Sequence, residues 1–185
     1  MRWLYIVNFI FILSTSTIIY TGVLSNPLLT YVTQDQNTWF ESIKPYCNPV
    51  EVGMAFKRMP APQDNTSQAY AAACYALAGK IEKAHKKIDE FPKNKQAWAA
   101  NIVFNVAHPI ADMGDDESAG PIMQLVVYYY PNHYMALYHA GISLYATGHT
   151  IDAEKHLTNF LTLYKNNDGW RKRAESVLEK IRSKT

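Results

Sequence analysis

A repeated spacing of small residues is the feature that most constrains how this chain can fold. Gly79, Gly114 and Gly148 lie 35 and then 34 residues apart, and each is followed five positions later by an alanine. A period of about 34 residues is the length of one helix–turn–helix unit. A glycine just after a helix supplies the left-handed residue of the turn, and an alanine early in the next helix lets its antiparallel partner approach closely. The spacing therefore predicts an all-α stack of helix pairs.

The last unit, at residues 134–164, has the clearest helical pattern. Its sequence, YMALYHAGISLYATGHTIDAEKHLTNFLTLY, contains one amphipathic segment on each side of Gly148. At helical spacing each segment gathers small and apolar residues on one face, and these two faces are predicted to pack on each other. The residues are Leu137, Ala140, Gly141 and Leu144 in the first helix, and Leu157, Phe160 and Leu161 in the second.

Residues 66–167 resemble the tetratricopeptide repeat (TPR) family. When Gly148 is placed on the turn glycine of the motif, several other motif positions align with residues of this chain. These are the second-helix alanine (Ala153), the Leu-Gly pair (Ala140 and Gly141), the late apolar position (Phe160), the terminal proline of the middle unit (Pro131) and the first-helix tyrosine of the first unit (Tyr75). The resemblance implies a superhelix over residues 66–185, in which an amphipathic helix at residues 170–181 caps the last unit.

Three proline-containing sites depart from the motif. Pro92 comes four residues before the proline position of the first unit, so that unit should end early and the next should start near Asn94. The His108-Pro109 pair is predicted to interrupt the first helix of the middle unit, because proline lacks the backbone N–H. Gly120-Pro121 is expected in the first turn of the following helix.

The N-terminal segment is apolar enough to cross a membrane. Residues 3–24 form a run of 22 residues without a charge, which as a helix spans about 33 Å. Arg2 precedes the run and the next basic residue is Lys44, so the positive-inside rule predicts a cytoplasmic N-terminus. We therefore expect residues 1–25 to be a transmembrane signal anchor. The chain would then be a single-pass protein of the bacterial inner membrane, with its repeat domain in the periplasm.

The alternative is a signal peptide cleaved before Asn26, which would release a soluble exported adaptor. Val23 and Ser25 satisfy a loose small-residue rule for cleavage. The uncharged run is nevertheless longer than a typical signal-peptide core, and an Ala-x-Ala site is absent. No cysteine directly follows the run, the first being Cys47, which excludes a lipoprotein.

Residues 26–65 are predicted to be a connector that contains one helix near residues 49–59. Asn48 is a suitable helix cap, Pro49 fits a first helical turn, and Glu51 stands where a capping-box acid belongs.

The two cysteines are predicted to form a disulfide. Cys47 directly precedes the connector helix, and the TPR register places Cys74 on the side of its helix that faces the preceding helix. Thiols exported to an oxidising compartment form disulfides, and this one would close a loop of roughly 28 residues. Two buried free thiols are the alternative.

Composition and motifs argue against other functional classes. Eighteen Lys and Arg against sixteen Asp and Glu leave a net charge of +2, too small an excess to predict a nucleic-acid partner. No phosphate loop, Gly-x-Ser-x-Gly motif or Ser-His-Asp order is present, so neither an enzyme nor a cofactor is expected. His108 and Asp112 could share a metal ion, but no third or fourth ligand is visible in the sequence. No metal is therefore predicted, and a small metal-dependent enzyme is the weakest alternative.

The TPR resemblance implies a concave partner-binding face lined by the first helix of each unit. Three of its residues, Tyr138, Ile142 and Tyr145, lie opposite the inward face of their helix and are predicted to contact a partner. The alternative is that these aromatic residues fill a tight superhelix. The candidate groove residues are Phe104, Asn105, His108, Met135, Tyr138, His139, Ile142 and Tyr145.

A separate expectation concerns tyrosines 128–130, which are predicted to lie in the core, with one of them exposed.

Anchor, repeats and groove together predict a protein that binds other proteins. It would be either a membrane-anchored scaffold or assembly factor, or an accessory subunit of a membrane complex. In both cases the protein partner is met on the exported side of the membrane.

Overall fold

The computed structural model describes residues 38–183, and this part of the chain is all-α, without a strand. Residues 38–43 are helical and lead into a short 3-10 helix, η1 (Lys44–Tyr46). The other helices are α2 (Val52–Arg58), α3 (Asn65–Leu77), α4 (Ile81–Asp89), α5 (Lys93–Asp112), α6 (Asp116–Tyr129), α7 (Tyr134–Ala146), α8 (Thr150–Leu163) and α9 (Gly169–Arg182).

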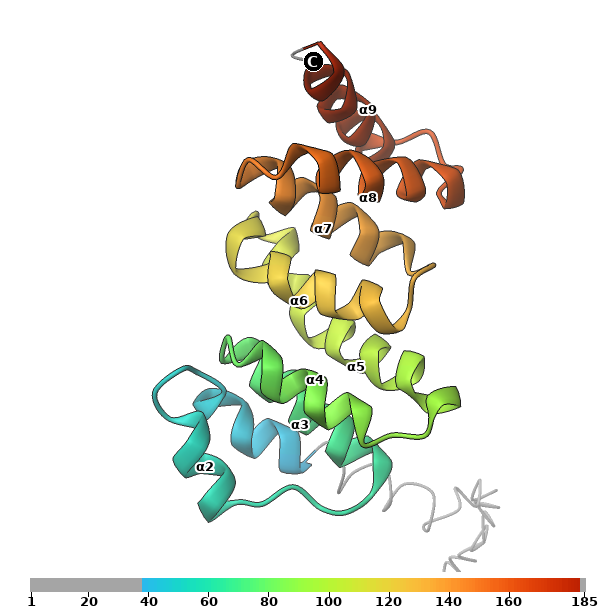
Figure 1. The fold of residues 1–185 in the computed structure, drawn as a ribbon. Helices are drawn as coiled ribbons and strands as arrows, with labels where there is room; N and C mark the ends of the chain where they lie inside the picture. Colours follow the sequence, from blue (N-terminus) through green and yellow to red (C-terminus); the bar gives the residue numbers. More distant parts are fainter. Residues whose placement is uncertain (1–37, 184–185) are drawn as a thin grey trace, which may run out of the picture.

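Six of the helices form three antiparallel pairs, α3–α4, α5–α6 and α7–α8, which stack one on another (Figure 1). Successive pairs touch through α3 and α5 and through α6 and α7, while α9 packs on α7 and α8 at the end of the stack. The turns within pairs lie along one edge of the stack. The connections between pairs, α4–α5, α6–α7 and α8–α9, lie along the opposite edge, which we call the inter-pair edge (Figure 1).

The structure confirms the roles predicted for the regularly spaced glycines and alanines. Gly79, Gly114 and Gly148 have φ values of 66°, 87° and 83°, in the left-handed region that residues with a Cβ adopt only at a cost. Each glycine follows the first helix of a pair, α3, α5 or α7. The alanines five residues later are fully buried, and they are Ala84, Ala119 and Ala153.

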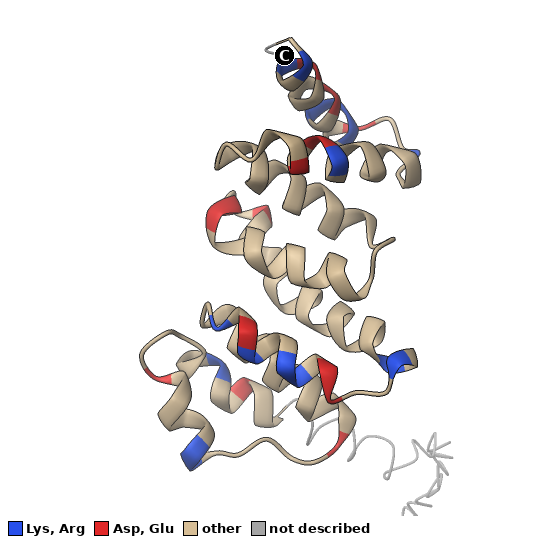
Figure 2. Ribbon diagram, in the orientation of Figure 1, with Lys and Arg blue, Asp and Glu red and all other residues tan. Residues whose placement is uncertain are grey.

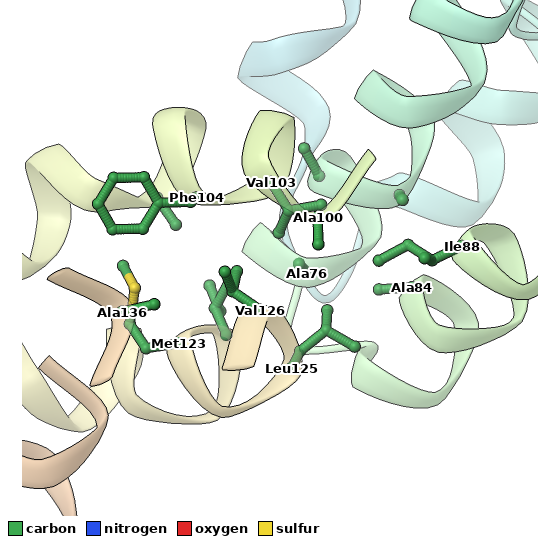
Figure 3. Close-up of a cluster of buried hydrophobic side chains, with 14 of the residues drawn as sticks. Ala76, Ala84, Ile88, Ala100, Val103, Phe104, Met123, Leu125, Val126 and Ala136 are labelled. Carbon is green, nitrogen blue, oxygen red and sulfur yellow. The ribbon is translucent and has the colours of Figure 1, made fainter. Parts of the chain in front are cut away.

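The core runs along the stack between the paired helices (Figure 3). Its first part joins α3 to α7 and includes Val103 and Phe104 of α5 with Met123 and Val126 of α6. Its second part joins α7, α8 and α9. The first part is rich in alanine, so the helices lie close together, and every pair depends on its neighbours for burial of its apolar face.

The predicted interruption at Pro109 is wrong. α5 continues through Pro109 to Asp112, and α6 likewise contains Pro121 beyond its first turn. Both prolines are exposed. The carbonyl that a helical proline leaves unbonded belongs to the residue four positions earlier, here Asn105 or Glu117, and both of those residues are exposed too. Water can hydrogen-bond these carbonyls, so the helices continue.

The described part of the predicted connector is folded onto the repeat stack. Phe40, Ile43 and Val52 are buried against α3, and the Phe40 ring stacks on Tyr70 of α3 at 4.5 Å. The helix in this segment begins at Val52 rather than at Pro49. The Asn48 side chain accepts hydrogen bonds from the backbone N–H groups of residues 50 and 51 and so forms a turn before the helix starts.

The disulfide prediction is confirmed. Cys47 and Cys74 are bonded, with their Cα atoms 4.9 Å apart. The bond ties the end of η1 to the last turn of α3, so it holds residues 38–59 against the first helix pair.

The capping helix is confirmed as α9. Asp168 caps it by accepting hydrogen bonds from the backbone N–H groups of Trp170 and Arg171. No helix within residues 38–183 is long and apolar enough to cross a membrane. The predicted membrane span, residues 3–24, lies outside the described residues.

Candidate functional site

The candidate groove residues divide into a buried and an accessible set. Tyr138 is 1% exposed and His139 2%, and Ile142 and Phe104 are also buried. Asn105 is exposed, and His108, Met135 and Tyr145 are partly buried. The prediction that Tyr138 and Ile142 are offered to a partner is therefore wrong, because neither side chain has free surface.

Helix α9 is the reason for the burial of Tyr138. The Tyr138 ring meets Trp170 of α9 edge-on at 5.0 Å and lies 5.1 Å from Phe160 of α8. Ile142 belongs to the same cluster. The sequence suggested that α9 caps the last pair but not that it covers this face of α7. The chain fills this part of the predicted groove with its own side chains.

A polar cluster lies between α5 and α7, where two of the predicted groove residues meet. The Nε2 atom of His108 is 3.3 Å from a carboxylate oxygen of Asp112, one helical turn further along α5. The Nε2 atom of His139, on α7, is 3.6 Å from the same oxygen. The two imidazole rings lie 5.1 Å apart, edge to face. One carboxylate oxygen is thus approached by two ring nitrogens from successive helix pairs.

Two further charges flank His139. A carboxylate oxygen of Asp116, the first residue of α6, is 3.9 Å from the Nδ1 atom of His139. The other oxygen of Asp116 is 3.3 Å from the guanidinium of Arg173 on α9. The cluster is thus built from four helices, α5, α6, α7 and α9.

The environment keeps His139 neutral at physiological pH. Burial lowers the pKa of His139 to about 4, and nearby His108 acts in the same direction, whereas the Asp112 carboxylate opposes both. Burial also raises the pKa of Asp116, against the attraction of Arg173. A neutral imidazole next to a carboxylate can act as a proton acceptor or as a metal ligand.

Three side chains of the cluster could together hold a metal ion. One ligand atom each from His108, Asp112 and His139 lies within 4.8 Å of the others. The third ligand, which the sequence did not reveal, is His139. The signal was present, because His108 and His139 both occur among the predicted groove residues. Stacking their two helices side by side would have brought them together.

The inter-pair edge carries exposed aromatic side chains that were not predicted as a site. Tyr128 is 71% exposed and Tyr130 is also exposed, so the expectation that only one of tyrosines 128–130 is accessible is wrong. Tyr134 at the start of α7 stacks on Tyr164 after α8 at 5.5 Å. The exposed large apolar residues at this edge are Trp98, Tyr128, Tyr130, Tyr134 and Leu163.

Comparison of the chain with protein-family models, with curated proteins and with solved structures gives no match. The TPR resemblance thus remains a prediction that rests on the motif positions and on the repeat period.

Proposed function

We propose that this protein is a membrane-anchored scaffold or accessory subunit whose TPR-like domain binds a protein partner on the exported side of the membrane. The observation that carries the proposal is the row of exposed aromatic side chains along the inter-pair edge. Tyrosine and tryptophan are the residue types most enriched among those that dominate protein–protein binding energy. The edge crosses the connections between pairs, so a partner bound there would contact more than one unit.

The charge distribution supports a protein partner rather than a nucleic acid. Charged residues gather on α2 to α4 and on α8 and α9, while most of α5, α6 and α7 is uncharged (Figure 2). The net charge of the chain is only +2. A neutral aromatic surface suits apolar anchors of a protein partner, whereas binding to nucleic acid needs a row of Lys and Arg side chains.

The proposed location rests on the N-terminal sequence and on the disulfide. The uncharged run at residues 3–24, with Arg2 before it, supports a single-pass anchor in the bacterial inner membrane. The Cys47–Cys74 bond is of a kind that persists in the periplasm and is rare in the cytosol.

A pull-down from membranes solubilised in mild detergent tests the proposal. The Tyr128→Ala/Tyr134→Ala double variant should capture much less partner, because losing two aromatic anchors costs about 2–4 kcal/mol of binding free energy. The matched control is Met113→Ala/Ile151→Ala. It removes two exposed apolar side chains, 79% and 86% accessible, from the opposite edge of the stack and should leave capture unchanged.

The outcomes also separate the two classes of role. A stoichiometric complex that survives purification supports an accessory subunit, and a partner seen only after crosslinking supports an assembly factor. A soluble mature chain that starts at Asn26 would instead support the exported adaptor. Equal capture by both double variants would contradict the inter-pair edge as the binding surface.

A further inference from the structure

We propose that His108, Asp112 and His139 form a binding site for a divalent transition-metal ion of the zinc type, held between α5 and α7. The site is independent of the inter-pair edge. Its ligands come from two successive helix pairs, so a bound ion would cross-link the middle unit to the last one.

The spacing of the ligand atoms fits tetrahedral coordination. Zinc lies at about 2.0–2.2 Å from imidazole nitrogen and carboxylate oxygen, so two ligand atoms at a tetrahedral angle are roughly 3.4 Å apart. The Asp112 oxygen is 3.3 Å from Nε2 of His108 and 3.6 Å from Nε2 of His139. Two of the three separations thus match this value, and the third, between the two imidazoles, is within 4.8 Å. Rotation of the side chains must bring the imidazoles together around the ion where this third separation exceeds the tetrahedral value.

The buried imidazole nitrogens provide a second, independent observation. Both ring nitrogens of His139 and the Nε2 atom of His108 are buried, and their contacts with the Asp112 and Asp116 carboxylates are not hydrogen bonds. Buried polar atoms are almost always satisfied, and one left unpaired costs about 1–3 kcal/mol. A cation at the proposed position would satisfy Nε2 of both histidines. The remaining nitrogen of His139, Nδ1, would face the Asp116 carboxylate, an arrangement common behind zinc-binding histidines.

The charges and the donor set favour a zinc-type ion. Two imidazoles with one carboxylate suit zinc and its neighbours, whereas calcium and magnesium prefer oxygen ligands alone. The two carboxylates of Asp112 and Asp116 against the one guanidinium of Arg173 leave one negative charge in excess around the site, which attracts a cation. The Asp112 side chain is 42% exposed, so a fourth position is open to water or to a ligand supplied by a partner.

Metal titration of the full chain in detergent tests the site. The protein is prepared without a polyhistidine tag, treated with chelator and titrated with Co²⁺, whose visible absorption reports tetrahedral coordination, and with Zn²⁺ by calorimetry. We expect one equivalent of metal per chain. Asp112→Asn and His108→Gln should each weaken binding more than about tenfold. The matched control His149→Gln, at an exposed histidine before α8, should bind like the native chain.

Thermal unfolding supplies a second readout, which does not depend on the visible absorption of Co²⁺. Because the ligands join two helix pairs, Zn²⁺ should raise the unfolding midpoint of the native chain and of His149→Gln but not that of Asp112→Asn. Circular dichroism of the metal-free variants verifies that they are folded. Absence of saturable binding, or equal binding by the native chain and Asp112→Asn, would overturn the proposal and show adventitious metal only.

Discussion

Gly141 of α7 lies tightly against Leu157 of α8 in the last pair. A Cβ atom added there would be 2.7 Å from Cγ of Leu157 and 3.3 Å from its backbone nitrogen. Leu157 is fully buried, so its side chain cannot swing away. Gly120 of α6 has a similar contact with Ser143 of α7.

We expect Gly141→Ala to destabilise the protein although alanine favours helix. Overpacking typically costs about 1–3 kcal/mol, more than the roughly 0.5–1 kcal/mol gained in helix propensity. Chemical denaturation measures the change in the free energy of unfolding. The control is Gly53→Ala in α2, where an added Cβ meets nothing within 4 Å and stability should be unchanged or slightly higher. A Gly141→Ala protein as stable as Gly53→Ala would show that the helices can separate at little cost.

Single residues of the candidate site were predictable only in part. The sequence placed His108 and His139 on one face because the repeat register fixes which helix positions face the groove. The burial of Tyr138 was not predictable from that register, because it depends on Trp170, which lies beyond the repeat. Tyr128 lies in the last turn of α6 and is exposed. Neither the repeat period nor the amino-acid composition predicts where that helix ends relative to α4.

The elements themselves followed more directly from the sequence. Glycine turns and buried alanines at a fixed spacing encode both the turn and the helix contact, so the three pairs could be predicted. Pro109 could not be placed correctly, since its effect depends on whether the carbonyl of Asn105 is accessible to water. The sequence predicted a helix and a disulfide in residues 38–59 but not that Phe40, Ile43 and Val52 pack on α3, because the repeat register does not extend to this segment.

At the scale of elements, removal of the disulfide should loosen the N-terminal segment. A disulfide that closes a loop of this length raises the free energy of unfolding by about 3 kcal/mol. The Cys47→Ala/Cys74→Ala variant should therefore unfold at lower denaturant concentration. Trp39 reports the loss locally, because its indole N–H donates to the carbonyl of Met59 at 3.3 Å. Its fluorescence should change before the helix content of the stack falls. Coincident transitions of the two signals would show that the segment and the stack unfold as one unit.

For the whole molecule, the last helix covers the end of the stack. Ala174, Val177, Leu178 and Ile181 of α9 are buried in the same cluster as Leu137 and Phe160. Deletion of residues 168–185 should uncover this apolar surface and lower the thermal midpoint. Size-exclusion chromatography with light scattering should detect association that depends on protein concentration. A truncated chain that remains monomeric and stable would mean that α7 and α8 can bury this face without α9.

The position of α9 also bears on how large an assembly of this protein can become. Without α9 the apolar face of the last pair would be uncovered, and it could accept an apolar surface of another molecule in a head-to-tail contact. Such a contact does not close on itself, and its repetition gives a fibre of indefinite length. α9 occupies that surface with a helix whose outer side is charged. We therefore expect this one short helix to prevent head-to-tail polymerisation.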